Sequence, residues 1–429
     1  MQHIAAHNEG PAAFGIDPGS QIRGTSVPGE LCDRIIDAVG YGVREWDFVT
    51  CRDSLRACSL VCKAWLPRSR MHLWTTVTLC GRNELQALSR VLTKYSHWGN
   101  NVFELNIDID DAGWQTFPLL LAHKLPRMVQ LRLQGRREHN GNLLLRPLHF
   151  SALSTFTSCL HWTEWRHCAV PSAPLYKATS VTRFQISDVA LPSLSALGYV
   201  LISLPSLTTL ICEFVSWDND GSSLPFTPST TGLLHIHDLS IRDMDFSEEL
   251  LDGLLTIIDP KALDTLRVFP RSMDQIQNVG RLCDRAGPSL RHLFIGDTSK
   301  MSVGASNYPN PFPGLCNNIN IKTLRFEAYG RDLRWLSLAV EHFQLPFLTR
   351  LIVMSNCPFK LRKLHLSQLD RCVSRIGFNP GEVVFEIYSY QLERLTRMLP
   401  EISRMMVKTC SRGALRFQPG PECEWWERL

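Results

Sequence analysis

The residues of this sequence best suited to chemistry are cysteines and histidines, since thiolates and imidazoles are the usual protein ligands of zinc. Four of them, Cys159, His161, His167 and Cys168, lie close together in the chain. Their spacing differs from the cysteine pairs, two to four residues apart, that structural zinc sites use. We therefore interpret the four as structural residues.

Two further pairs have the spacing of possible ligands. Cys58 and Cys62 lie one helical turn apart, but no second pair accompanies them, so small core residues are favoured over a metal site. His235 and His237 lie two residues apart on a predicted strand, so their side chains point to the same side of it. Such a pair is more often made of ordinary surface or core polar residues than of metal ligands. The sequence predicts neither a metal nor a cofactor.

Enzymatic signatures are missing from the sequence. Gly40-Tyr41-Gly42 comes nearest to a dinucleotide-binding fingerprint, but it lacks the third glycine and follows a predicted helix, so we interpret Gly40 as the helix end. There is no P-loop, HExxH or G-x-S-x-G motif. A hydrolase whose triad is assembled from dispersed Ser, His and Asp residues remains a weak alternative. We predict that the protein is not an enzyme.

The composition is that of a globular chain: of 429 residues, 44% are hydrophobic and 20% charged. A net charge of +4 is too small to indicate a nucleic-acid or anionic-membrane partner. No apolar run reaches the roughly 18 to 20 residues that cross a bilayer. The 14 cysteines have no repeating spacing and the start has no signal-peptide pattern, which favours reduced thiols and an intracellular protein, cytoplasmic or nuclear.

Three short helices are predicted near the N-terminus, after a Gly- and Pro-containing flexible tail over residues 1–26. The first starts at Pro28, and the second starts at Ser54 after a loop over residues 41–53 and carries apolar residues to Trp65. The third starts near Pro67 and leads into a β-prone run over residues 75–79. So short a module buries little surface, so we expect it to depend on a neighbour or a partner.

This segment, residues 27–74, resembles the F-box of basidiomycete F-box proteins. The resemblance rests on Val27-Pro28, Glu30-Leu31, the Ile35-Ile36 pair, the run LRACSLVCKAWLPRSR from Leu55 and the closing His72-Leu73-Trp74. It implies binding to the Skp-type adaptor of SCF ubiquitin ligases and, through it, to a cullin-RING ligase. The sequence departs from the family in having Val27 where a leucine is usual and in a longer, more polar loop.

The resemblance also implies which residues contact the adaptor. Without it, the same apolar positions would be interpreted as the internal core of a three-helix module, and the two interpretations can hold for different residues. The implied contacts are Val27, Pro28, Leu31, Ile35, Ile36, Leu55, Cys58, Leu60, Val61 and Trp65.

Downstream, a pattern L-x-x-L-x-apolar recurs every 25 to 31 residues. This period is near the long end of the leucine-rich-repeat range, in which each unit is a short strand and a return segment stacked on the next. Proline stands two residues before the first apolar position in several copies and predicts the end of the preceding helix. Nine copies are clear and that at residue 156 is weak; their central residues are Leu105, Leu131, Phe156, Phe184, Leu210, Leu239, Leu266, Leu293, Leu324 and Leu351.

The predicted fold is therefore α/β: an irregular leucine-rich-repeat solenoid over residues 75–400, with parallel strands on one face and helices on the other, and a C-terminal cap or tail over 401–429. It is irregular because only Asn356 supplies the Asn or Cys that a regular repeat places after its strand, and because insertions are expected over 217–231 and 298–313. An ordinary α/β sheet is the alternative, which the near-equal periods disfavour.

Together these features predict the substrate-recognition subunit of an SCF-type E3 ubiquitin ligase, whose solenoid holds an unknown protein substrate near the ligase. The alternative is an interaction scaffold that forms no cullin complex. The sequence indicates neither nucleic acid nor membrane as a partner.

Overall fold

A computed structural model of the chain describes residues 28–42, 48–108, 120–121, 124–134, 180–191, 194–202, 204–217, 233–296, 318–328, 345–355, 363–374, 381–388, 400 and 402–420. The chain divides into two compact units, Met1–Leu73 and Trp74–Leu429. We call them the helical unit and the repeat unit.

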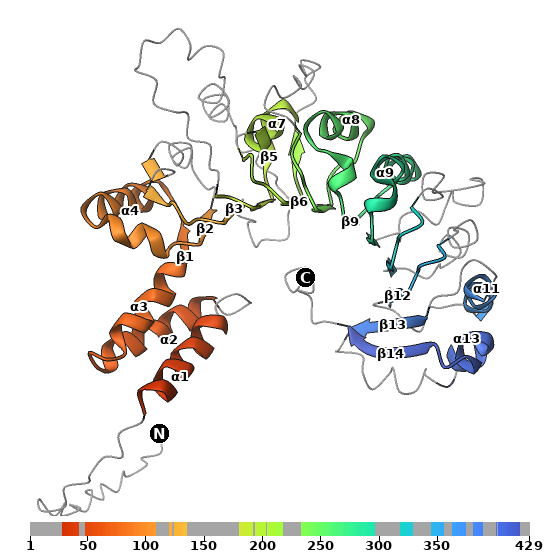
Figure 1. Cartoon of the computed structure of the whole chain (residues 1–429), viewed down its shortest axis with the longest axis horizontal. Coiled ribbons are helices and arrows are strands. Elements are labelled where there is room, and N and C mark those ends of the chain that lie inside the picture. Colours follow the sequence, from red (N-terminus) through yellow and green to blue (C-terminus); the bar gives the residue numbers. More distant parts are fainter. Residues whose placement is uncertain are drawn as a thin grey trace, which may run out of the picture. The chain divides into compact units, whose positions relative to one another are not determined.

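The helical unit contains α1 (Gly29–Gly42), α2 (Phe48–Val61) and most of α3 (Leu66–Thr75) (Figure 1). Its interior is made by Ile36 of α1 and Leu55 of α2, which are fully buried, together with Cys32 one turn before Ile36. Helix α2 begins six residues before Ser54, so the predicted loop up to Asp53 is wrong. The apolar spacing of Phe48, Cys51 and Leu55 continues the helical stripe in that direction.

Gly40 does not end its helix, contrary to the prediction, because α1 continues to Gly42. The reason for a glycine at this place is steric. The imidazole of His72 from α3 lies directly against the Cα of Gly40 and leaves no room for a side chain.

The repeat unit is built on one sheet of twelve parallel strands, in which sequence order is also spatial order. Every neighbouring pair is parallel. The strands are β1 (Thr76–Leu79), β2 (Glu104–Asp108), β3 (Gln130–Gln134), β4 (Arg183–Ser187), β6 (Thr209–Glu213), β8 (Asp238–Arg242), β9 (Thr265–Val268), β10 (His292–Ile295), β11 (Thr323–Ala328), β12 (Arg350–Ser355), β13 (Glu382–Tyr388) and β14 (Leu415–Gly420).

The nine clear copies of the repeated pattern coincide with the nine strands of this sheet from β2 to β12, which confirms the repeat prediction for them. Their central residues stand side by side in register, as in Leu105–Leu131 and Leu293–Leu324. Each is buried in one continuous core with the apolar residue two positions later. Because side chains alternate along a strand, this pattern turns one whole face of the sheet toward the core.

The weak copy around Phe156 adds no strand between its neighbours. Strand β3 pairs directly with β4, although 53 positions separate Val129 from Thr182, which are hydrogen-bonded at the start of these strands. The prediction of a repeat there is therefore wrong, since the two neighbouring strands already satisfy each other. Phe156 itself lies outside the described residues.

The prolines before the strands occupy tight turns. The amide of Met128 donates to the carbonyl of Leu125, and the same turn recurs before Leu207, Leu290 and Leu348. Pro126, Pro205, Pro288 and Pro346 each take the second position of such a turn, where the fixed φ of proline is favourable. The prolines thus set the direction in which the chain enters these four strands.

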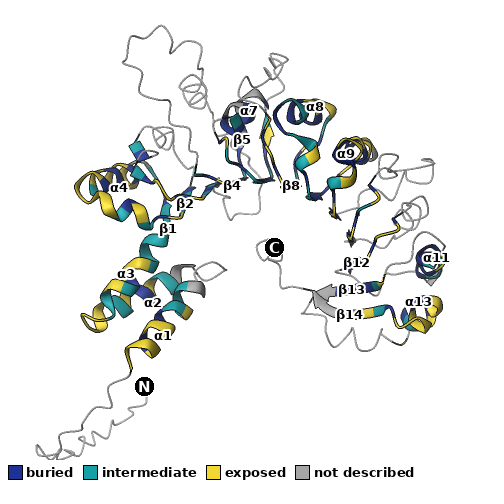
Figure 2. Ribbon diagram, in the orientation of Figure 1, coloured by how far each residue is buried: buried dark blue, intermediate teal, exposed yellow. Residues whose placement is uncertain are grey.

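The helices of the repeat unit lie on one side of the sheet, where their apolar faces share the core with the strands (Figures 1 and 2). Helix α8 starts at a serine cap, since Ser247 Oγ accepts from the amide of Leu250, and Ser272 caps α9 in the same way. They are α4 (Arg82–Lys94), α7 (Leu194–Ile202), α8 (Glu248–Ile257), α9 (Met273–Ala286), α11 (Lys363–Val373) and α13 (Val407–Ser411), with 3-10 turns at Ser96–Asn101, Pro260–Ala262 and Gly287–Ser289.

After three strands the chain turns through a left-handed residue: Asp188, Phe214 and Asp243 have φ of 57°, 52° and 50°. Val189, Val215 and Met244 follow and are buried, so apolar packing takes the place of the Asn or Cys of a regular repeat. A two-stranded sheet, β5 (Ala190–Leu191) with β7 (Ser216–Trp217), extends two of these turns. Most of the predicted insertion over 217–231, and that over 298–313, lies outside the described residues.

Candidate functional site

The helical unit exposes apolar side chains on α1 and α2. Leu60 is 85% exposed, Val61 62%, Leu31 49% and Ile35 43%. A unit of this size has little core, so leaving four large apolar side chains in solvent is a cost that burial against a partner would remove.

These residues belong to the two helices of one hairpin. Helices α1 and α2 pack against each other and are joined by only five residues, a length typical of antiparallel neighbours. The first turns of α1, which carry Leu31, therefore lie at the same end of the hairpin as the last turn of α2, which carries Leu60 and Val61. We call Leu31, Ile35, Leu60 and Val61 the hairpin anchors.

The ten residues implied to contact an adaptor separate into groups. Ile36 and Leu55 are interior residues of the helical unit, with exposed fractions of 0% and 1%. Pro28 is exposed together with the hairpin anchors, Cys58 and Trp65 are half-buried, and Val27 lies outside the described residues. The exposed subset is the part able to meet a partner without unfolding.

Asp37 fastens α1, which carries two hairpin anchors, to α3. Its two carboxylate oxygens accept from Nε and Nη2 of Arg68, both at 2.7 Å, and Oδ1 also lies 2.7 Å from Nε2 of His72. These hydrogen bonds, first that of Arg68 and then that of His72, hold the pKa of Asp37 well below its usual range. The bidentate guanidinium contact fixes the angle at which α3 crosses α1.

The possible metal ligands are dispersed in the structure. Within the described ranges, no group of three or more His, Cys, Asp and Glu side chains is placed to hold a metal ion. Cys62 is exposed just after α2. The sequence predicted His235 and His237 on a strand, but both precede β8. Cys159, His161, His167 and Cys168 lie outside the described residues.

A second surface is the face of the sheet opposite the helices, which we call the strand face. It carries the residues that alternate with the core positions, which are the odd-numbered positions of the sheet strands from β1 to β13 and the even-numbered positions of β14. Polar and charged side chains are frequent on it. The charged ones whose side chains are described are Glu104, Arg132, Arg183, Glu213, Asp238, Arg242, Arg267, Arg325, Glu327, Arg350, Glu382, Glu386 and Arg416.

Several of these charges are held by neighbours on adjacent strands. Arg267 forms an ion pair with Asp238 and lies 5.2 Å from the ring centroid of Phe294. Arg242 lies between the rings of Phe214 and Phe269, at 5.8 and 5.3 Å. Burial raises the pKa of Glu213, and the nearby charge of Arg242 opposes that shift.

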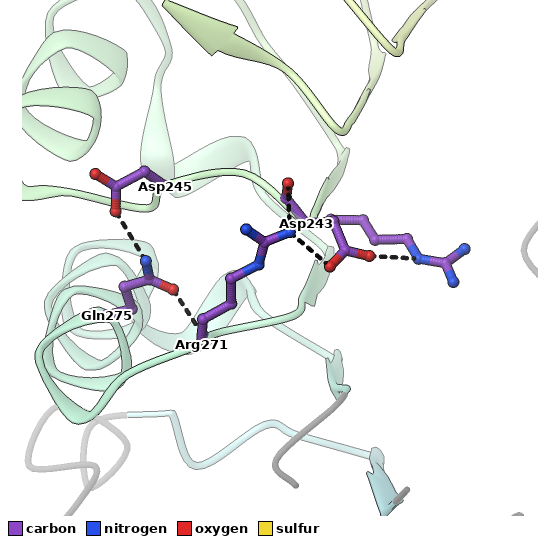
Figure 3. A network of polar contacts seen from close by, with 5 residues as sticks. Asp243, Asp245, Arg271 and Gln275 are labelled. Atoms are coloured by element: carbon purple, nitrogen blue, oxygen red, sulfur yellow. Dashed lines mark hydrogen bonds and ion pairs between the residues drawn. The ribbon is translucent and has the colours of Figure 1, made fainter. Parts of the chain in front are cut away.

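At the ends of β8 and β9 a polar network closes the turns (Figure 3). Arg271 Nη2 donates to Asp243 Oδ1 at 2.8 Å, while Gln275 accepts from the amide of Arg271 and donates to Asp245 Oδ1 at 2.8 Å. Two of these contacts, Arg271 with Asp243 and Gln275 with Asp245, join neighbouring repeats. The network stabilises the stacking of two repeats. Because its polar groups bond to one another, we assign it a structural role.

Comparison with known proteins finds a distant structural likeness. No family model and no curated protein matches the chain. Among solved structures, the chain is similar to one described as "Crystal structure of Rad7 and Elc1 complex in yeast", with 12% sequence identity and a TM-score of 0.35 over 84% of this chain and 88% of that chain. A likeness of that size carries no argument about function. No helix within the described residues is long and apolar enough to span a membrane.

Proposed function

We propose that the chain is the substrate-recognition subunit of an SCF-type ubiquitin ligase, with an F-box in the helical unit and a leucine-rich-repeat-like solenoid in the repeat unit. The observation that carries the proposal is the set of hairpin anchors, four large apolar side chains exposed on a helical hairpin. The resemblance of residues 27–74 to the F-box supports the choice of a Skp-type adaptor as the partner. The protein is proposed to be intracellular and to catalyse no reaction itself.

Under this proposal, the two units bind different partners. The helical unit binds the adaptor as a helix pair presented to an apolar groove, with side chains spaced by three and four residues as anchors. The repeat unit holds the target, and tethering both in one chain raises the effective concentration of the target near the ubiquitin-loaded enzyme. A rigid stack of twelve parallel strands suits that task, because each strand is fixed by its neighbours.

The test is co-purification of the folded full-length chain with a Skp-type adaptor and a cullin. Leu31→Asp and Leu60→Asp place a charge at exposed anchors. We expect both variants to fold and to bind the adaptor with an affinity lower by about tenfold or more. Val407→Asp is the matched control: Val407 is 60% exposed but lies on α13 of the repeat unit. A folded wild-type chain that binds no adaptor would contradict the proposal.

The same pull-down separates the second candidate, an interaction scaffold outside any ligase. In that case the adaptor is retained and the cullin is missing from the complex. Cullin association that depends on Leu31 and Leu60 supports the ligase subunit instead.

A further inference from the structure

Arg183 is the first residue of β4, on the strand face, with Gln130 and Thr209 beside it in register. Its side chain is half-buried. Within the described part of the chain its guanidinium makes no ion pair and no hydrogen bond, and the Nε atom is enclosed without a partner. The guanidinium is therefore held in a partly desolvated place, with its Nε–H donor enclosed and unused.

The charges around Arg183 do not compensate it fully. Burial, the largest influence, lowers the pKa of Arg183, and the positive charges of Arg132 and Arg267 act in the same direction. Asp238 and Glu104 act against it, but Asp238 is already the ion-pair partner of Arg267. Arginine stays protonated at neutral pH in spite of such shifts, so the site keeps a positive charge.

The carboxylate of Glu104 is also engaged elsewhere. Its Oε1 accepts from Nε2 of Gln130 at 3.2 Å, and Oε2 lies 3.4 Å from the hydroxyl of Thr76. The strand face over β3 and β4 thus combines one incompletely compensated guanidinium, a second arginine and neutral hydrogen-bonding groups. A partly buried charge without a partner is unfavourable, and a carboxylate arriving in bidentate geometry would compensate it.

We propose that the strand face around Arg183 binds an acidic segment of a partner protein, with the Arg183 guanidinium donating to an aspartate or glutamate carboxylate. This inference rests on the proposed function in one respect, that the repeat unit holds a protein. Charge complementarity selects the occupant: the positive charges of Arg132 and Arg267 act on Arg183, and the side chains of Gln130, Gln185 and Thr209 beside it are neutral. The two carboxylates nearby, Glu104 and Asp238, are already bonded to Gln130 and Arg267. The flat fork of a guanidinium matches a carboxylate, and exclusion of water strengthens that contact.

The test is a fluorescence-anisotropy titration of the full-length chain with a fluorescein-labelled ten-residue peptide that contains four glutamates among glycine and serine. Matched peptides carry glutamine or phosphoserine in place of glutamate. We expect the glutamate peptide to bind, to weaken as salt is raised, and to lose about tenfold or more in affinity with Arg183→Gln. Arg183→Lys keeps the charge without the fork and is expected to fall between the two.

Arg281→Gln is the control, because Arg281 is an exposed arginine of α9 on the helix side, where it pairs with Glu248 and Asp252. Equal binding of the glutamine peptide, equal losses with Arg183→Gln and Arg281→Gln, or binding of the phosphoserine peptide alone would overturn the proposal. An unchanged melting temperature shows that Arg183→Gln remains folded. Adaptor co-purification is measured on the same protein, so loss of peptide binding and failure of the ligase proposal are seen separately.

Discussion

Arg325 and Glu386 form a 2.6 Å ion pair on the strand face, from β11 and β13, with β12 between them. Their side chains are only 7% and 3% exposed. The Nη2 of Arg325 also contacts the sulfur of Met354 on β12 at 2.8 Å. Charges this deeply buried persist only when they are paired, so the pair ties three successive repeats together electrostatically.

Removing one member of this pair is expected to be much worse than replacing both. Arg325→Met leaves the Glu386 carboxylate buried without its cation, and we expect a loss of about 3 to 5 kcal/mol in the free energy of unfolding. The double variant Arg325→Met, Glu386→Leu removes both charges and is expected to recover a large part of that loss. Urea unfolding of the single and double variants measures both; a double variant less stable than the Arg325 variant contradicts the expectation.

The hydrogen bonds to Asp37 predict how the helical unit responds to acid. The pKa of Asp37 is lower in the folded chain than the value of about 3.9 expected in an unfolded one, so the carboxylate stabilises the unit above that value. The stabilisation is lost as pH falls below about 4 toward the folded pKa. Asp37→Asn should therefore speed amide exchange in α1 and α3 at pH 7, with a difference from wild type that shrinks below pH 4.

Hydrogen exchange followed by mass spectrometry on peptides from residues 28–42 and 66–75 measures this, with both proteins at the same pH. Asp33→Asn is the control, because Asp33 is an exposed carboxylate on the same helix. An Asp37→Asn effect that stays constant from pH 7 to pH 3 would show that the carboxylate charge is not the cause.

The strands of the repeat unit could be predicted from sequence because two apolar positions per repeat must alternate to reach one core. That constraint predicted Leu105, Leu239 and Leu351 as core residues at equivalent positions of their strands. The weak copy at Phe156, with Ser158 at the last apolar position, adds no strand, since β3 and β4 bond directly to each other. A short apolar pattern describes a possible strand, while hydrogen bonding to both neighbours decides whether it joins the sheet.

The charges of the strand face were not found from sequence, because they occupy the variable positions between the core residues. Arg183 and Arg132 stand on different strands, 51 positions apart in number, and only the register of β3 and β4 brings them together. The hairpin anchors were among the ten residues that the resemblance implied as adaptor contacts. Helical periodicity alone, however, cannot separate the exposed Leu31 and Ile35 from the neighbouring interior Ile36. That distinction depends on which side of α1 packs against α2, a tertiary property.

Gly40 gives a steric test of how α1 and α3 pack. A Cβ at residue 40 would lie 2.3 Å from Nδ1 and 2.5 Å from Cγ of His72, so Gly40→Ala must displace the imidazole and with it the contact to Asp37. We expect a loss of about 1 to 3 kcal/mol, as for overpacked interiors, in spite of the better helix propensity of alanine. Gly29→Ala is the control, because a Cβ there meets nothing within 4 Å and the same substitution is expected to be neutral or slightly stabilising. Thermal unfolding and amide exchange of α3 compare the two, and equal stability of both variants would show that the imidazole moves away from Gly40 at little cost.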